Sequence, residues 1–200
     1  MLRCVLILAA VCSLAASEPQ SRFALADLTA AAHEIQHLRV TFRQIKDLEL
    51  FDQPVVTAGV LEISRPLSSV RWEFTGRSVL VLRNDRLQRW NARGERETIR
   101  GGPASQALMG QMNAMLTGDW RTLDKLFTIT LDPSGEPKVH LRPRDEEMTR
   151  YVTEIRIAFQ DDLSAPRELI ISAPGGDLTR YEFDVPERPT DLAAARFAGP

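Results

Sequence analysis

The stretch 70–91, VRWEFTGRSVLVLRNDRLQRWN, decides the fold predicted for this chain of 200 residues. Its first residues alternate apolar with polar side chains, the two-residue period of a strand with one buried face. The apolar run 79–82 follows after a short break and ends at Asn84-Asp85, a dipeptide typical of turns, before residues 87–91 resume the pattern. Strands this closely spaced favour an antiparallel meander, because a parallel pair needs a long crossover.

Strand patterns recur on both sides of this stretch. In all, the sequence predicts about ten strands, and turn residues such as Pro174-Gly175-Gly176-Asp177 separate several of them. The remaining predicted strands cover residues 40–44, 54–64, 127–131, 138–141, 151–159, 167–172 and 178–185. No linker and no internal repeat interrupts the series, so we expect one domain.

Helical periodicity is confined to three segments. Apolar residues recur at three- and four-residue spacing over residues 25–38 and again over 108–116, which predicts a helix in each. Gly118 ends the second helix. Asp119 is a suitable N-cap for a third, short helix that extends through Leu126.

Residues 1–17 have the pattern of a secretory signal peptide. A basic start at Arg3 precedes an apolar run, and Ala15-Ala16-Ser17 supplies the small residues of a cleavage site. The apolar run is shorter than the roughly 20 residues that span a bilayer. We therefore predict export through a cleaved signal peptide, with residues 18–200 forming the exported domain.

Composition and charge exclude several classes of protein. Charged residues make up 26% and apolar residues 44% of the chain, which excludes wholesale disorder. The net charge of -2 gives no sign of nucleic-acid binding, and we expect no such partner. Both cysteines, Cys4 and Cys12, lie in the predicted signal peptide, so disulfides and thiol catalysis are not expected. Val11, which precedes Cys12, is poorly suited to precede a lipid-modified cysteine.

One pattern suggests catalysis. His33-Glu34-Ile35-Gln36-His37 matches H-E-x-x-H, in which two histidines one helical turn apart bind zinc and the glutamate activates water. On the predicted helix, however, both histidines point away from the apolar face, and no third histidine follows at the longer signature's spacing. We expect that changing both to alanine leaves stability and activity nearly unaltered. A zinc hydrolase stays open as an alternative function.

Other catalytic patterns are missing from the sequence. It contains no G-x-S-x-G nucleophile elbow and no Gly-rich phosphate loop. The acidic runs Asp145-Glu146-Glu147 and Asp161-Asp162 lack the spacing of calcium loops, so we interpret them as solvated charges. We therefore expect no cofactor, no metal and no enzyme chemistry.

Methionines form the apolar stripe of the predicted helix 108–116. Their unbranched, polarizable side chains adapt to variable apolar partners. Two interpretations stay open: the stripe packs an ordinary core, or the helix covers an apolar ligand cavity inside a curved sheet. The second predicts that Met112→Glu weakens the binding of an apolar probe with little loss of fold.

Several short motifs occur in the order of one known family. Val40-Thr41-Phe42-Arg43-Gln44 is similar to its F-x-Q opening strand, and Arg65-Pro66 to the end of its second strand. Trp72 corresponds to a tryptophan of its third strand, and Ala194-Ala195-Arg196-Phe197 to its closing A-x-x-F. Over residues 25–197 the chain thus resembles LolA, the periplasmic lipoprotein carrier of Gram-negative bacteria.

The resemblance implies a mainly β, α+β fold. One curved antiparallel sheet of about ten strands would form an unclosed β-barrel with helices as a lid, and apolar side chains inside would receive acyl chains. The resemblance also implies that Arg65 ties the lid region to the barrel and supports cargo release. The predicted ligand-binding residues are Arg65, Leu61, Ile63, Val70, Trp72, Phe74, Trp90, Met109, Met112, Met115 and Leu116.

The resemblance implies a location and partners as well. We expect a monomeric periplasmic carrier or chaperone of acylated lipoproteins or another lipid, loaded by an inner-membrane donor complex and unloaded to an outer-membrane acceptor. The loop 48–54 departs from the family's glycine-rich loop, since it carries Leu48, Leu50 and Phe51. The cargo therefore stays open, and a lipid-sensing binding module without a transport role is a second alternative.

Overall fold

The computed structural model of the chain describes residues 23–84, 86–98, 114 and 118–200. Its strands within these residues are β1 (His37–Asp47), β2 (Val55–Ser64), β3 (Ser69–Phe74), β4 (Ser78–Arg83), β5 (Arg86–Asn91), β6 (Arg96–Glu97), β7 (Phe127–Leu131), β8 (Lys138–Pro143), β9 (Glu154–Phe159), β10 (Pro166–Ser172) and β11 (Leu178–Phe183). They form one 11-stranded sheet in the order β6-β5-β4-β3-β2-β1-β11-β10-β9-β8-β7. The predicted fold, mainly β with a single antiparallel sheet that does not close, is confirmed.

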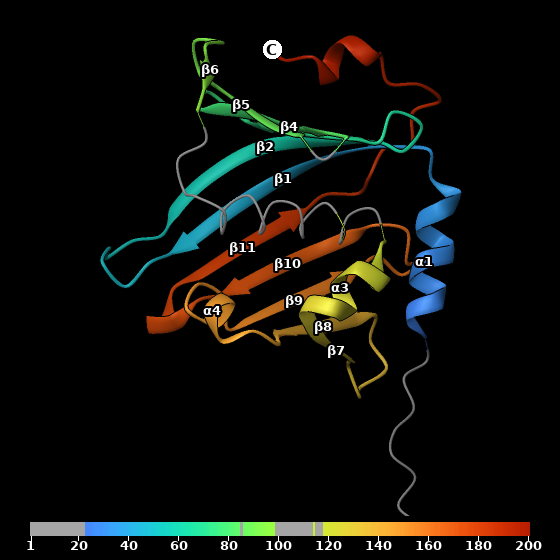
Figure 1. Ribbon diagram of the computed structural model, residues 1–200, viewed down its shortest axis with the longest axis vertical. Coiled ribbons are helices and arrows are strands. Elements are labelled where there is room, and N and C mark those ends of the chain that lie inside the picture. Colours follow the sequence, from blue (N-terminus) through green and yellow to red (C-terminus); the bar gives the residue numbers. More distant parts are fainter. Residues whose placement is uncertain (1–22, 85, 99–113, 115–117) are drawn as a thin grey trace, which may run out of the picture.

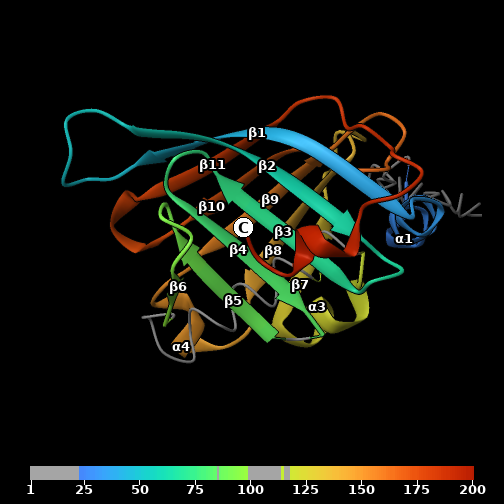
Figure 2. The ribbon, with the colours of Figure 1, turned by 90° about the horizontal axis from the view of Figure 1, so that it is seen from above.

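Two meanders meet at the centre of this sheet. Strands β1 to β6 follow one another in space as in sequence, and so do β7 to β11, which run across the sheet in the same direction. The last strand, β11, then pairs with the first, so that Phe42 lies opposite Phe183. The sheet curves so that its two halves face each other, and we call the concave side that they enclose the inner face, or trough, of the sheet (Figure 1). Figure 2 shows the same curvature from above.

Few helices accompany the sheet within the described residues. They are α1 (Leu25–Glu34), α3 (Trp120–Leu126), α4 (Glu146–Thr149) and the 3₁₀ turns η1 (Pro174–Gly176) and η2 (Ala194–Phe197). In Figure 1, α1 stands across one end of the sheet and η2 lies on the outer side of the half formed by β1 to β5. None of these described helices has the length and apolar character needed to cross a bilayer.

The strand predictions agree closely with the structure. The predicted N-cap is also present, because the Asp119 side chain accepts a hydrogen bond from the backbone N–H of Thr122 at the start of α3. One short strand, β6, was not predicted; it follows the turn at Arg93-Gly94 and pairs with β5. Strand β9 begins at Glu154 and not at Tyr151, whose side chain is exposed after α4.

The prediction for the first helix is wrong at its end. Helix α1 stops at Glu34, and Ile35 already has extended backbone angles. His37 belongs to β1, where it lies opposite Ser64 and is buried. Leu38 fits both a helical and a strand period, and the long pairing of β1 with β2 decides in favour of the strand.

Two apolar clusters hold the fold together. The larger one fills the inner face and joins both halves of the sheet, from Leu61 and Trp72 to Leu141 and Ile155. The smaller one lies on the outer face, where Phe197 of η2 packs with a patch from β4, β5 and the C-terminal segment. Its buried members are Val79, Val81, Trp90, Leu192 and Phe197.

Candidate functional site

The inner face is apolar because alternate residues of every long strand point to it. In β1 these are Leu38, Val40 and Phe42, and the polar residues between them are exposed. Cross-strand partners keep the same side, since Leu61 lies opposite both Val40 and Trp72. The result is a continuous apolar wall that runs along the trough.

An aromatic cluster forms the middle of this wall. The ring of Phe42 has its centroid 5.2 Å from that of Trp72, 5.4 Å from Phe74 and 5.8 Å from Tyr181. Gly59, opposite Phe42 in the register, leaves the space for that ring, because a Cβ at position 59 would lie 2.5 Å from its Cζ. The edge-on contacts of Phe42 with Trp72 and Phe74 add stability beyond their buried area.

A cavity opens at the α1 end of the trough. It has a volume of about 770 Å³, and α1, the β2–β3 connection, β4 and α3 contribute its described walls. This size falls within the range of roughly 300–1,000 Å³ typical of ligand pockets. Its described lining residues are Thr29, His33, Ser64, Arg65, Ser68, Ser69, Leu82, Asn84, Gly118, Asp119, Trp120 and Arg121.

Arg65 joins the sheet to the end of α1 at this cavity. Its Nε donates a hydrogen bond of 2.8 Å to the carbonyl oxygen of Ile35, and its backbone N–H donates one of 3.0 Å to the carbonyl of Gln36. Arg65 also lines a separate narrow recess, together with Leu61 and Ile63, as expected from their shared strand parity. Partial burial lowers the pKa of the Arg65 guanidinium from its ordinary value.

A second cavity, of about 280 Å³, opens at the opposite end of the trough. Its apolar wall is formed by Trp72, Phe74 and Leu80 together with the ring of Tyr181. Three cationic residues and three small or amide residues complete its described lining: Lys46, Arg77, Arg89, Gln44, Thr57 and Ser78. The two cavities thus lie at opposite ends of the apolar trough.

Tyr181 is the buried polar group of the aromatic cluster. The Gln44 side-chain amide donates a hydrogen bond to its hydroxyl oxygen. Burial raises the pKa of Tyr181 to about 12, because the phenolate cannot be solvated there, although the hydrogen bond from Gln44 acts in the opposite direction. The hydroxyl therefore stays neutral throughout the physiological range.

This raised pKa predicts a loss of stability in alkali. Between about pH 10 and about pH 12 the tyrosine of the unfolded chain ionises while Tyr181 in the folded protein does not. We expect the free energy of unfolding to fall by about 2–3 kcal/mol over this interval through this group alone. Urea unfolding across that range should show the fall, and Tyr181→Phe should remove it. An equal fall in Tyr181→Phe would contradict the assignment.

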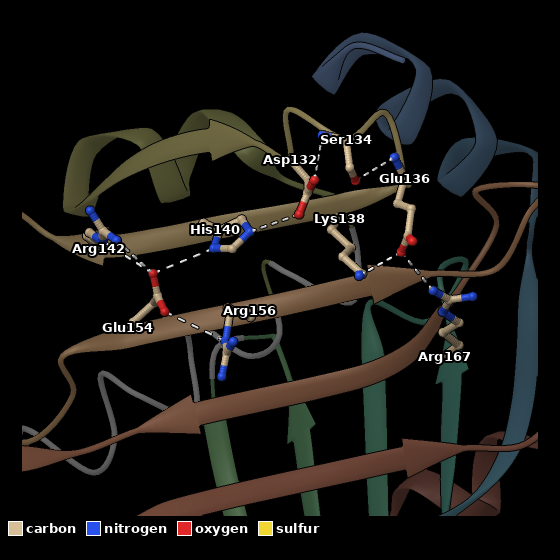
Figure 3. Close-up of polar contacts among 9 residues, drawn as sticks. All are labelled: Asp132, Ser134, Glu136, Lys138, His140, Arg142, Glu154, Arg156 and Arg167. Carbon is tan, nitrogen blue, oxygen red and sulfur yellow. Dashed lines mark hydrogen bonds and ion pairs between the residues drawn. The ribbon is translucent and has the colours of Figure 1, made fainter. Parts of the chain in front are cut away.

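The outer face of β7 to β9 differs completely from the trough. Figure 3 shows its charged side chains paired between strands and within them, with Glu154 between His140 of β8 and Arg156 of its own strand. Glu136 likewise contacts Lys138 and Arg167. Most of these groups are partly exposed, so we interpret this face as solvated. No three histidine, cysteine or acidic side chains of the described residues gather closely enough to hold a metal ion.

Comparison with models of protein families matches residues 33–199 to the family described as outer membrane lipoprotein carrier protein LolA. The chain belongs to the LolA family. The resemblance expected from the sequence motifs is therefore confirmed. A search of curated proteins found no match.

Several solved structures are similar to this chain at low sequence identity. An uncharacterized conserved protein from Thermus thermophilus is 8% identical, with a TM-score of 0.50 over 86% of this chain and 91% of that chain. A LolA superfamily protein from Nitrosomonas europaea is 9% identical, with a TM-score of 0.42 over 88% and 97% of the two chains. Lipoprotein LppX from Mycobacterium tuberculosis is 12% identical, with a TM-score of 0.41 over 84% and 97%.

The LolA-like trough brings together most of the residues predicted to bind ligand. Leu61, Ile63, Val70, Trp72 and Phe74 all belong to the inner-face cluster, or pack against it, and Arg65 lies at its rim. Four further predicted residues fall outside the described part of the chain: Met109, Met112, Met115 and Leu116.

Trp90 is the exception among the predicted residues. It lies opposite Val79 in the register and belongs to the outer cluster beneath η2, away from the LolA-type trough. The apolar run 79–82 gives β4 apolar side chains on both faces. The alternation of apolar and polar residues therefore could not predict which face the side chains of its partner strand, β5, would join. The Trp90 prediction therefore has no support from the geometry.

The H-E-x-x-H prediction is also corrected. Only His33 lies on α1, where it is exposed, whereas His37 is buried in β1. The two histidines therefore do not have the one-turn helical spacing that zinc proteases use. The expectation that His37 points to solvent was wrong, and its replacement should affect stability.

Several residues of the site were missed by sequence reasoning. Tyr181 and Phe183 reach the aromatic cluster from the last strand, and Lys46 and Arg89 reach the second cavity. Their parity within each strand was readable in the sequence. The pairing of β11 with β1 that brings them to the LolA-type trough was not.

Proposed function

We propose that the protein is an extracytoplasmic carrier that holds the acyl chains of lipoproteins or of another lipid in the trough. One observation carries this proposal: a continuous apolar inner face has a cavity at each of its ends. Membership of the LolA family supports it. The role is one of binding and transfer, without enzyme chemistry.

The energetics of the trough suit an acyl chain. Each methylene moved from water to an apolar wall gains about 0.8 kcal/mol, so a long chain is held by many small contributions. Such contacts are non-directional, and the chain can therefore slide along the wall as it enters or leaves. A site of this kind binds and releases cargo without a covalent step.

Location and partners complete the proposal. The signal-peptide pattern of residues 1–17 supports export to the periplasm. There, a monomeric carrier would receive cargo from an inner-membrane donor complex and deliver it towards the outer membrane. A lipid-sensing module would bind the same chains but would not hand them to acceptor vesicles, so a transfer assay separates the two roles.

Leu80→Glu tests the proposed trough. Leu80 lines the second cavity and lies opposite Arg89, which can pair with the new carboxylate, so we expect the variant to fold. A carboxylate on the apolar wall should weaken binding of an apolar fluorescent probe by about tenfold or more, because the probe cannot solvate it. Probe titration and displacement by palmitate measure this effect.

Val56→Glu is the matched control. Val56 lies in β2 but is 50% exposed, on the opposite side from Leu61 and Ile63. The Val56→Glu variant introduces the same charge as Leu80→Glu and should leave probe binding unchanged. Absence of probe binding by the unmodified protein, or an equal loss in both variants, would refute the trough as the acyl-chain site.

A further inference from the structure

The second cavity combines an apolar wall with three cationic side chains from separate parts of the fold. Lys46 comes from the end of β1, Arg77 from the turn before β4, and Arg89 from β5. The wall beside them is built by Trp72 and Phe74, which also belong to the aromatic cluster. Positive charge therefore lies at the mouth of a continuous apolar surface.

The strand register directs two of these cations to the inner face. Lys46 has the parity of Phe42 and Gln44, which are both buried on that face. Arg89 lies opposite Leu80, and Leu80 lies opposite Trp72, so these three residues share one side of the sheet. A slip of one residue would place either cation on the outer face.

The charge of this mouth is not balanced within the described part of the chain. No carboxylate is among the described residues that line the cavity. Arg89 pairs with Glu97 at 3.1 Å, but neither Lys46 nor Arg77 forms an ion pair with any described residue. The arginines on the outer face of β8 and β9 differ, because Arg142 and Arg156 both contact Glu154 (Figure 3).

We infer that this mouth binds the headgroup of a lipid with a net negative charge, while its acyl chains lie along the aromatic wall. The inference rests on the proposed carrier function and adds the class of cargo. Lysine and arginine are the side chains that recognise phosphate and carboxylate groups, Arg through two parallel hydrogen bonds. Desolvation by the neighbouring rings strengthens such a contact.

A lipid fits this cavity better than a free anion does. Inorganic phosphate would bury none of the apolar surface of Trp72, Phe74 and Leu80, whereas an acyl chain attached to the anion covers that surface. The cavity also adjoins the aromatic cluster through Trp72 and Tyr181, so the chain has an apolar path onward from the headgroup.

Two lysolipids with the same palmitoyl chain test the inference: lysophosphatidylglycerol, which is anionic, and lysophosphatidylcholine, which is net neutral. We expect the unmodified protein to bind the anionic lipid about tenfold more tightly at low salt. Lys46→Gln combined with Arg77→Gln should abolish this preference by weakening the binding of the anionic lipid. Arg142→Gln combined with Arg167→Gln removes the same charge from the outer face and should keep the preference.

The possible results separate this inference from the carrier proposal. Equal affinity for both lipids in the unmodified protein would overturn the headgroup site and leave the carrier proposal standing. Binding of neither lipid would refute the carrier proposal itself. Inorganic phosphate that competes with lysophosphatidylglycerol as strongly as the lipid competes with itself would show a free-anion site, and would overturn the inference too.

Discussion

Glu62→Ala is expected to lower the free energy of unfolding by about 3 kcal/mol, at the lower end of what the loss of one partner of a buried ion pair costs. The Glu62 side chain is 0% exposed, and Arg196 Nε donates a hydrogen bond of 2.9 Å to its Oε2. Arg71 Nη1 lies 3.8 Å from the same oxygen, and Arg39 Nε lies 3.7 Å from Oε1. The substitution leaves Arg71, itself only 8% exposed, with Glu73 as its remaining carboxylate.

Urea unfolding followed by tryptophan fluorescence measures this change. The matched control is Glu182→Ala, which breaks the exposed Arg43–Glu182 pair at 2.8 Å and should cost less than about 1 kcal/mol. Glu62→Ala should also loosen η2, since Arg196 is bound to Glu62, and should thereby expose the C-terminal segment to proteases. Equal stability losses in the two variants would show that the buried charge cluster around Glu62 contributes no more to stability than an exposed ion pair does.

Arg65→Leu is expected to slow the release of cargo by about tenfold while leaving folding and loading intact. Arg65 holds the sheet rim to the end of α1 through its hydrogen bond to the Ile35 carbonyl, a charge-assisted contact worth about 1.5–3 kcal/mol. Leucine removes that tie. It also adds apolar surface beside Leu61 and Ile63, which favours the loaded state.

A two-step assay measures the effect, with palmitoyl-lipid loading first and transfer to acceptor vesicles second. Arg65→Lys should rescue release only partly, because an ammonium group cannot reproduce the planar guanidinium contact. Arg121→Leu removes a charge from the same cavity at an exposed position and serves as the control. Normal release by Arg65→Leu would show that the arginine has no part in transfer.

Local alternation in the sequence was sufficient to predict most of the strands. It also placed Leu61, Ile63, Val70 and Trp72 on sides that the structure shows to be shared. The alternation succeeds because consecutive side chains of a strand must point to opposite faces, whatever the rest of the chain does. Helix α3 was equally predictable, since Asp119 caps it locally.

The end of α1 shows where local patterns compete. Leu38 fits the helical period of the preceding residues as well as the strand period of Val40 and Phe42, and only the pairing with β2 decides between them. The histidine pattern at 33–37 looked like a zinc motif for the same reason, because it was placed on a helix that continues too far. Tertiary pairing overrides the local preference here.

The sequence by itself determined which residues of each strand share a side, and so the composition of the apolar wall. Only the tertiary structure decided which side faces the trough and which lies under the C-terminal segment. Trp90 and Glu62 are buried on the outer face because Phe197 and Arg196 cover it, and Glu62 and Arg196 lie 134 residues apart in the chain. Alternation is a local property, whereas the covering of a face depends on contacts between distant segments, which no local pattern records.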